Sequence, residues 1–263
     1  MQASHITLFS VDISTLKKSE IISLIEEKIL EGSKLSVFTP NTKMLLAAKN
    51  QEAIRKLLNR SNLNLPDGIG VYIAARVLSD TTLSRSGGID IAEDIMKMAQ
   101  SRALRVFLLG GKKGTASSAA KELKKIYPNL TVCGTHHGYF SKIGEQNDKV
   151  IKKINDAHPD ILFVCFGFPK QEIWIDKNLA RLSSVKLAMG LGGSLDVWAG
   201  NIHRAPRLMQ KFGFEWLWRV MLEPNRASVF LDIPHFFFLL AAYKRRVLRA
   251  ERRGTKKSFS SLH

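Results

Sequence analysis

Apolar runs without polar alternation are the feature that most constrains how this chain can fold. In the second half of the chain they cover residues 104–111, 130–140, 160–168 and 185–193. The segments between them carry apolar residues at three- and four-residue intervals, the period of an amphipathic helix. Unalternating strands separated by helices are typical of parallel strands covered on both faces. We therefore predict an α/β fold with a doubly wound, mostly parallel, Rossmann-like sheet over residues 1–200.

In the first half of the chain, strand-like and helix-like segments alternate less regularly. Residues 6–13 and 34–40 read as strands. A turn is expected at Pro66-Asp67-Gly68, where proline presets φ and glycine accepts a positive φ. Helices are expected over residues 18–30, 41–60, 71–79 and 89–103.

The pattern changes after Gly200. The chain of 263 residues has 40 Lys+Arg and 23 Asp+Glu, a net charge of +17, within an otherwise ordinary globular composition of 45% hydrophobic residues. Residues 201–263 alone hold 13 Lys+Arg and 4 Asp+Glu, an excess of +9, together with many aromatic side chains. We predict a separate helical, basic appendage over residues 201–263 with an anionic partner, either a membrane surface or a nucleic acid.

Several sequence features bear on the cellular setting. The two cysteines, Cys133 and Cys165, each lie in an expected strand and form no disulfide framework, which favours a reduced, cytosolic setting. The first residues lack a cationic lead into a long apolar stretch, so no signal peptide is expected. No run reaches the roughly 18 apolar residues of a membrane-spanning helix. We expect a soluble or peripheral protein.

Ligands of open parallel sheets bind beyond the carboxyl ends of the strands. One candidate there is the glycine turn at Gly110 and Gly111, although its spacing matches neither a dinucleotide fingerprint nor a P-loop, and a plain strand–helix turn explains it as well. No metal site is expected, because no two aspartates stand two apart and the adjacent His136 and His137 would point to opposite faces of a strand. Asp67 is open to two interpretations, a turn residue or a catalytic carboxylate.

Six segments taken together resemble the WecG/TagA/CpsF glycosyltransferase family. The resemblance extends from Thr7 to Arg226 through the motifs TPNTKMLLAAKN, LPDGIGVYIAARVL, RSGGIDI, VFLLGGKKG, DILFVCFGFPKQEIW and the block from Gly190 to Arg226. It implies an inverting, metal-independent enzyme without a cofactor. Such an enzyme transfers a sugar from a UDP-sugar to a polyprenyl-diphosphate-linked sugar at the cytoplasmic face of the membrane. N-acetylmannosamine is the best-known donor sugar, in wall teichoic acid assembly, and a uronic acid or glucose serves in relatives.

The resemblance also implies roles for individual residues. Asp67 becomes the general base that takes a proton from the acceptor hydroxyl. Thr39 and Asn41 are placed in the active-site pocket, although Asn41 would serve equally as a helix cap. Arg85 becomes a ligand of diphosphate or acceptor oxygens, in a loop that reads RSGG where the family usually has RVTG or RVPG. Gln171 becomes an amide that contacts the sugar or the diphosphate, with helix capping as its alternative.

Further residues are assigned to the nucleotide, the acceptor and the membrane. Tyr139 is a candidate to pack on uracil and Asp196 to accept a hydrogen bond from the uridine, with core packing and helix-dipole stabilisation as the alternatives. By resemblance, the appendage docks over the active site and meets the lipid diphosphate through Arg204, Arg207, Arg219 and Arg226. Composition alone suggests interfacial insertion of Phe236, Phe237, Phe238, Leu239 and Leu240, with Lys244, Arg245 and Arg246 on anionic headgroups.

A basic α/β chain could also belong to two other classes of protein. A nucleic-acid-binding protein would explain the charge of +17, but the basic residues alternate with an apolar cluster and no standard nucleic-acid motif is present, so no nucleic-acid partner is expected. An NAD(P) enzyme is disfavoured by the glycine spacing after residues 104–109. The sequence leaves the oligomeric state open, a homo-oligomer included.

Overall fold

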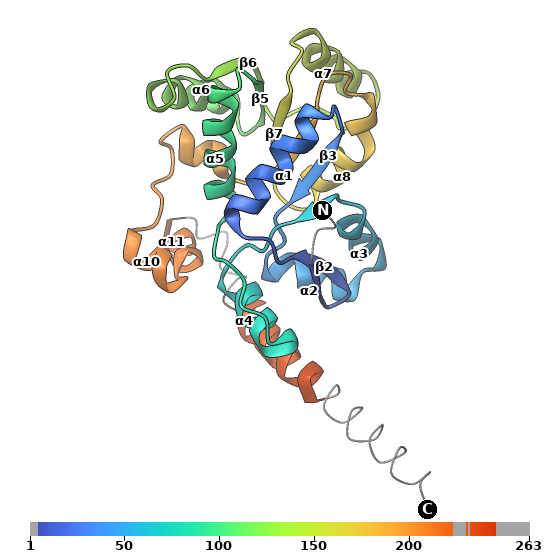
Figure 1. Ribbon diagram of the computed structural model, residues 1–263, viewed down its shortest axis with the longest axis vertical. Helices are drawn as coiled ribbons and strands as arrows, with labels where there is room; N and C mark the ends of the chain where they lie inside the picture. Colours follow the sequence, from blue (N-terminus) through green and yellow to red (C-terminus); the bar gives the residue numbers. More distant parts are fainter. Residues whose placement is uncertain (1–4, 223–229, 231, 246–263) are drawn as a thin grey trace, which may run out of the picture.

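The computed structural model describes residues 5–222, 230 and 232–245 of the chain (Figure 1). Its centre is a six-stranded sheet in the order β4-β3-β8-β7-β5-β6, in which every neighbouring pair is parallel. The strands are β3 (Leu35–Phe38), β4 (Leu63–Asn64), β5 (Arg105–Gly110), β6 (Thr131–His136), β7 (Ile161–Cys165) and β8 (Leu187–Gly190). The four strands expected in the second half of the chain and the strand expected at 34–40 are confirmed.

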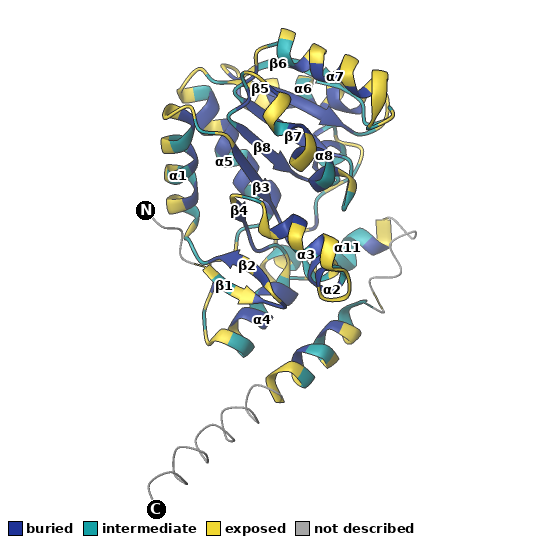
Figure 2. Ribbon diagram, turned by 90° about the vertical axis from the view of Figure 1, so that its right-hand side faces the viewer, coloured by how far each residue is buried: buried dark blue, intermediate teal, exposed yellow. Residues whose placement is uncertain are grey.

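Helices cover both faces of this sheet (Figure 2). In β7, Ile161 and Phe163 pack in one core cluster and Leu162 and Val164 in the other, because successive strand residues point to opposite faces. The first cluster contains side chains of α1 (Lys18–Leu30), α5 (Gly88–Ser101), α6 (Thr115–Ile126) and α9 (Ser194–Trp198). The second contains side chains of α2 (Thr42–Asn50), α3 (Glu52–Asn59), α4 (Ile69–Ser79), α7 (Gly144–Asp156) and α8 (Lys170–Asn178). The predicted doubly wound α/β fold is therefore confirmed.

The N-terminal segment differs from its prediction. Residues 6–13 are not one strand but an antiparallel hairpin of β1 (His5–Leu8) and β2 (Val11–Ser14), separate from the main sheet. The turn residues Phe9 and Ser10 have φ values of 50° and 64°. Two left-handed residues make the tight turn that suits a two-residue hairpin, and such turns usually carry Asn or Gly. Phe-Ser gives no such signal, so the turn was missed.

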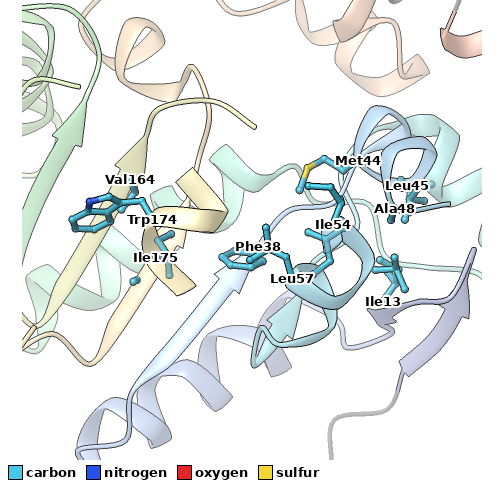
Figure 3. Packing of buried hydrophobic residues seen from close by; sticks show 14 of the residues in the cluster. Ile13, Phe38, Met44, Leu45, Ala48, Ile54, Leu57, Val164, Trp174 and Ile175 are labelled. Carbon is cyan, nitrogen blue, oxygen red and sulfur yellow. The ribbon is translucent and has the colours of Figure 1, made fainter. Parts of the chain in front are cut away.

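The helix expected over residues 41–60 is two helices. Gln51 is extended, with φ −129° and ψ 111°, and separates α2 from α3. The break lets Ile54 and Leu57 of α3 pack near Phe38 of β3, while Met44 and Leu45 of α2 lie in the same core farther along (Figure 3).

The described residues after Gly200 pack on the α/β body. They form α10 (Arg207–Phe212), α11 (Glu215–Leu222) and a helix over residues 232–245, which lies beside α4 (Figure 1). Phe236 and Leu240 of this last helix are buried in the core, and the Phe236 ring meets the edge of Phe9 at a centroid distance of 5.4 Å. In the described part of the chain, no helix has both the length and the apolar character required to span a membrane.

Candidate active site

A cleft of about 550 Å³ opens at the carboxyl ends of β3, β4, β7 and β8. The turns after these strands form its floor, and α11 and the helix over residues 232–245 form a wall. The residues that line the cleft include Thr39, Asn41, Asp67, Gly88, Gln171, Gly192, Glu215, Arg219, Asp232 and Phe237. Carboxyl ends of parallel strands are where such sheets bind ligands, so this cleft is the candidate active site.

Asp67 is held in the cleft by the turn that follows β4. Its backbone N–H donates to the carbonyl of Pro40 at 3.0 Å, which ties the turn to the end of β3. Gly68, with φ 81° and ψ 150°, takes a positive-φ conformation that favours glycine and directs the chain into α4. The Asp67 side chain is half-buried, and its Oδ1 accepts a hydrogen bond of 3.4 Å from the N–H of Gly88 at the start of α5. Asp67 is thus both a turn residue and a carboxylate that faces the cleft.

The surroundings of Asp67 raise the pKa of its carboxyl group above the ordinary value. Burial is the main cause, because protein atoms replace the water that would stabilise the charged form. Glu215 and Asp90 raise the pKa further, whereas Arg219 and the Gly88 N–H lower it. A carboxylate with a raised pKa is a stronger base than a free aspartate, which is what proton abstraction from a hydroxyl requires.

Thr39 and Asn41 line the same cleft as Asp67. Thr39 is buried and its Oγ1 donates to the carbonyl of Gly190 at 3.4 Å. Asn41 is the N-cap of α2, where its Oδ1 accepts from the Met44 N–H at 3.2 Å. Both side chains also line the cleft. The capping bond therefore fixes the Asn41 side chain at the edge of the cleft, and its role in the reaction stays a prediction.

Gln171 links two of the turns that form the cleft floor. Its Oε1 accepts from the N–H of Gly167 at 3.2 Å and from that of Gly192 at 2.9 Å. Its Nε2 donates to Glu172 Oε1 at 2.8 Å. The role of Gln171 on a sugar or diphosphate stays a prediction. Glu172 is fully buried, and burial raises the pKa of its carboxyl group. Sequence reasoning missed Glu172, because an acidic residue in the first turn of a helix ordinarily faces water near the dipole.

The predicted nucleotide contacts lie along the same sheet edge but do not line the cleft. At Gly110, with φ 141°, an added Cβ would come within 2.3 Å of the Cys165 carbonyl, so close packing of β5 on β7 already requires glycine there. Gly111, with φ 66°, accepts from the N–H of Gly138. Tyr139 is 67% exposed, and Asp196 accepts from Asn201 within its own turn at 3.2 Å. Their contacts with a nucleotide stay predictions.

Arg85 and Arg207 also lie outside the cleft lining. Arg85 is exposed and its Nη1 donates to the carbonyl of Lys211 at 2.9 Å, which fastens the loop before α5 to α10. Its guanidinium lies 6.0 Å from the centre of the Tyr72 ring. Arg207 is exposed at the start of α10. Their roles on a diphosphate stay predictions.

The remaining appendage residues take different positions in the structure. Arg219 lines the cleft and interacts electrostatically with Asp67, while Arg204 is paired with two carboxylates. Phe237 lines the cleft, Phe238 is 71% exposed, and Lys244 and Arg245 are exposed. The expected insertion of Phe236 and Leu240 into lipid is wrong, because both are buried in the protein core. Arg226 and Arg246 lie outside the described residues.

Some of the residues that line the cleft were not assigned to the site from the sequence. Glu215, Trp216 and Asp232 reach the cleft from the appendage. Trp216 stands in the motif that also carries Arg219, and that proximity was the available signal. Asp232 follows no motif and is brought to the cleft by the packing of the last helix. In the described part of the chain, no three His, Cys, Asp or Glu side chains are grouped as metal ligands would be.

The fold and the cleft are those of a doubly wound α/β enzyme, with a carboxylate of raised pKa at the edge of the sheet where ligands bind. A model of the glycosyl transferase WecG/TagA/CpsF family matches residues 6–250, so the chain belongs to this family. The family expected from the sequence motifs is thus confirmed, and the nucleic-acid alternative gains no support.

Two similar proteins share one activity name. The N-acetylglucosaminyldiphosphoundecaprenol N-acetyl-beta-D-mannosaminyltransferase of Staphylococcus aureus (strain MRSA252) is 32% identical over 250 residues, which cover 94% of this chain and 96% of that protein. The protein of the same name from Bacillus subtilis (strain 168) is 35% identical over 212 residues, which cover 81% and 79%. The similarity therefore extends over both the α/β body and much of the appendage.

Proposed function

We propose that this chain transfers N-acetylmannosamine from a UDP-sugar to N-acetylglucosamine carried on a polyprenyl diphosphate, with inversion and without a metal ion. The product would belong to cell-surface polysaccharide or teichoic acid synthesis. The relatives' shared name supports the sugar and the acceptor. The observation that carries the proposal is the Asp67 carboxylate, half-buried in the cleft with Arg219 acting on it.

In the proposed reaction Asp67 takes the proton from the acceptor hydroxyl. The hydroxyl oxygen forms a bond to the anomeric carbon as the bond from that carbon to the UDP phosphate oxygen breaks. The electron pair of the broken bond leaves with UDP, and attack from the opposite side inverts the anomeric centre. Cationic side chains and backbone N–H groups stabilise the charge on the departing diphosphate. Arg219 is suited to hold the acceptor diphosphate, because a guanidinium binds phosphate oxygens in pairs.

A turnover screen tests this proposal. The purified chain is incubated with a short-chain polyprenyl diphosphate N-acetylglucosamine and, one at a time, with UDP-N-acetylmannosamine, UDP-N-acetylglucosamine and UDP-glucose. We expect product with UDP-N-acetylmannosamine and an unchanged rate in EDTA. Transfer of another sugar would correct the donor, and complete inhibition by EDTA would overturn the metal-free mechanism. The absence of any transfer would overturn the function itself.

We also propose that the chain works as a peripheral protein on the inner, anionic face of the membrane. Large apolar side chains are exposed on α10, where Leu208 is 70% and Phe212 63% exposed, and on the last helix at Phe238. Basic residues accompany them, among them Arg207, Lys211, Lys244 and Arg245. Exposed apolar groups with adjacent cations suit reversible binding to an anionic lipid surface.

Vesicle sedimentation at physiological salt tests the membrane proposal. We expect retention on vesicles that contain anionic lipid and little on neutral ones, since each basic residue near an anionic surface contributes on the order of 1 kcal/mol. Phe212→Gln with Phe238→Gln should weaken retention several-fold. Ile126→Gln is the matched control, because Ile126 is 65% exposed at the end of α6. Retention by duplex DNA in place of lipid would instead support a nucleic-acid partner.

A further inference from the structure

Arg204 lies between two carboxylates that belong to different parts of the fold. Its Nη2 is 2.7 Å from Asp90 Oδ1 of α5, and its Nε is 3.3 Å from Glu215 Oε1 of α11. All three side chains are largely shielded, with exposures of 22% for Arg204 and 34% for each carboxylate. Arg204 is therefore already engaged within the protein and does not line the cleft.

Each carboxylate holds an element that contacts or faces Asp67. Asp90 Oδ2 accepts from the N–H of Gly87 at 3.2 Å and so fixes the turn whose next residue, Gly88, donates to Asp67. Glu215 lies in the first turn of α11, and Arg219 follows it by four residues on the same helical face. Through these two contacts, Arg204 joins the start of α5 to the start of α11.

The position also matters electrostatically. Asp90 and Glu215 both act on Asp67 in the direction that raises its pKa, and Arg204 supplies the positive charge between them. Other charged or titratable groups also face Asp67. Arg219 of α11 and Tyr72 of α4 interact with it, and Tyr72 in turn interacts with Arg85. Lys43 and Asp232 line the same cleft. Without Arg204, two negative charges beside Asp67 would lose their counter-ion.

We propose that Arg204 is a positioning residue of the transfer reaction: it fixes Gly88 and Arg219 around Asp67 and offsets the charges of Asp90 and Glu215, rather than binding the acceptor diphosphate. This inference rests on the proposed function. It assigns to Arg204 a role different from that of Arg219, although both arginines belong to the same basic appendage.

The steady-state kinetics of Arg204→Met test the proposal. We expect kcat to fall roughly tenfold or more, since small misplacements of catalytic groups cost one to two orders of magnitude, while the acceptor KM changes less than about threefold. The acid limb of the pH–rate profile should move to higher pH, because the unpaired Asp90 and Glu215 disfavour ionisation of Asp67. If Arg204 instead bound the acceptor diphosphate directly, Arg204→Met would raise the acceptor KM tenfold or more and leave the acid limb in place. That result would overturn the proposal.

Two further variants separate position from charge. Arg204→Lys retains the positive charge, so the acid limb of the pH–rate profile should return towards that of wild type. Lysine lacks the planar guanidinium group that reaches both carboxylates, so kcat should recover only in part. Arg204→Met combined with Glu215→Gln removes one uncompensated charge and should also move the acid limb back. Arg102→Met is the matched control, because it removes an arginine–glutamate pair from the far end of α5, where Arg102 contacts Glu26, and should change neither kcat nor the pH profile. An acid limb that fails to move back in the double variant would contradict the electrostatic role.

A measurement without substrate separates this proposal from the proposed function. Thermal unfolding of Arg204→Met, Asp90→Asn and their double variant gives the coupling between the two side chains. We expect the double variant to unfold at a higher temperature than the sum of the single losses predicts. Additive losses would overturn the link even in an active enzyme, whereas an inactive wild-type chain would refute the function and leave this coupling measurable.

Discussion

Asp67→Asn is expected to reduce sugar transfer by about 10²- to 10⁴-fold while the fold and the binding of UDP remain intact. The magnitude is that of losing a general base. Asparagine has nearly the same shape and can still accept from the Gly88 N–H, but it cannot take a proton from the acceptor hydroxyl. Turnover with the preferred donor, together with thermal protection by UDP, measures the two properties separately. Transfer at the wild-type rate would show that another group is the base.

The raised pKa of Asp67 also predicts how transfer by the wild-type chain depends on pH and how stable Asp67→Asn should be. In the proposed mechanism transfer needs the ionised carboxylate, and the pKa of Asp67 is raised by burial, so activity should fall with decreasing pH at values above the ordinary aspartate range. The folded state binds the proton of Asp67 more tightly than the unfolded state does. Its contribution to stability is therefore present at low pH and is lost as the pH rises through the raised pKa. Asp67→Asn should consequently be at least as stable as wild type near neutral pH, as judged by thermal unfolding.

Phe236→Ala is expected to destabilise the protein by about 3–5 kcal/mol, the cost of removing a buried aromatic ring. Phe236 is fully buried against Phe9 of the N-terminal hairpin, and its ring lies 3.7 Å from where a Cβ on Gly70 of α4 would stand. The same helix carries Asp232 and Phe237 into the cleft, so its release should also lower transfer. Denaturant unfolding measures the loss of stability, and hydrogen exchange over residues 232–245 shows whether the helix has detached.

Phe238→Ala is the matched control for Phe236→Ala. The two residues are of the same type and stand two positions apart, but Phe238 is 71% exposed. Its truncation should change the unfolding free energy by no more than about 0.5 kcal/mol, as is usual for exposed positions. Equal losses in the two variants would mean that the helix over residues 232–245 does not dock on the hairpin through Phe236.

The sequence by itself determined five of the six strands of the main sheet, most of the helices that cover it, and the family. Unalternating apolar runs such as 160–168 must be buried on both faces, and that condition leaves few architectures. The position of Asp67 was also accessible, because Pro66 and Gly68 are local turn signals and the carboxyl ends of parallel strands share one edge. Local residue patterns are sufficient where backbone conformation and burial repeat along the chain.

Only the tertiary structure decided which appendage residues face the cleft, the core or the solvent. Phe236, Phe237 and Phe238 are identical in sequence terms, yet one is buried, one lines the cleft and one is exposed. Likewise, Arg204 and Arg219 look alike until Asp90 and Glu215 are seen to pair with only the first. These differences arise from contacts between segments more than 100 residues apart in the chain or from partners on another element, and the energy of such a contact depends on a geometry that no local pattern encodes.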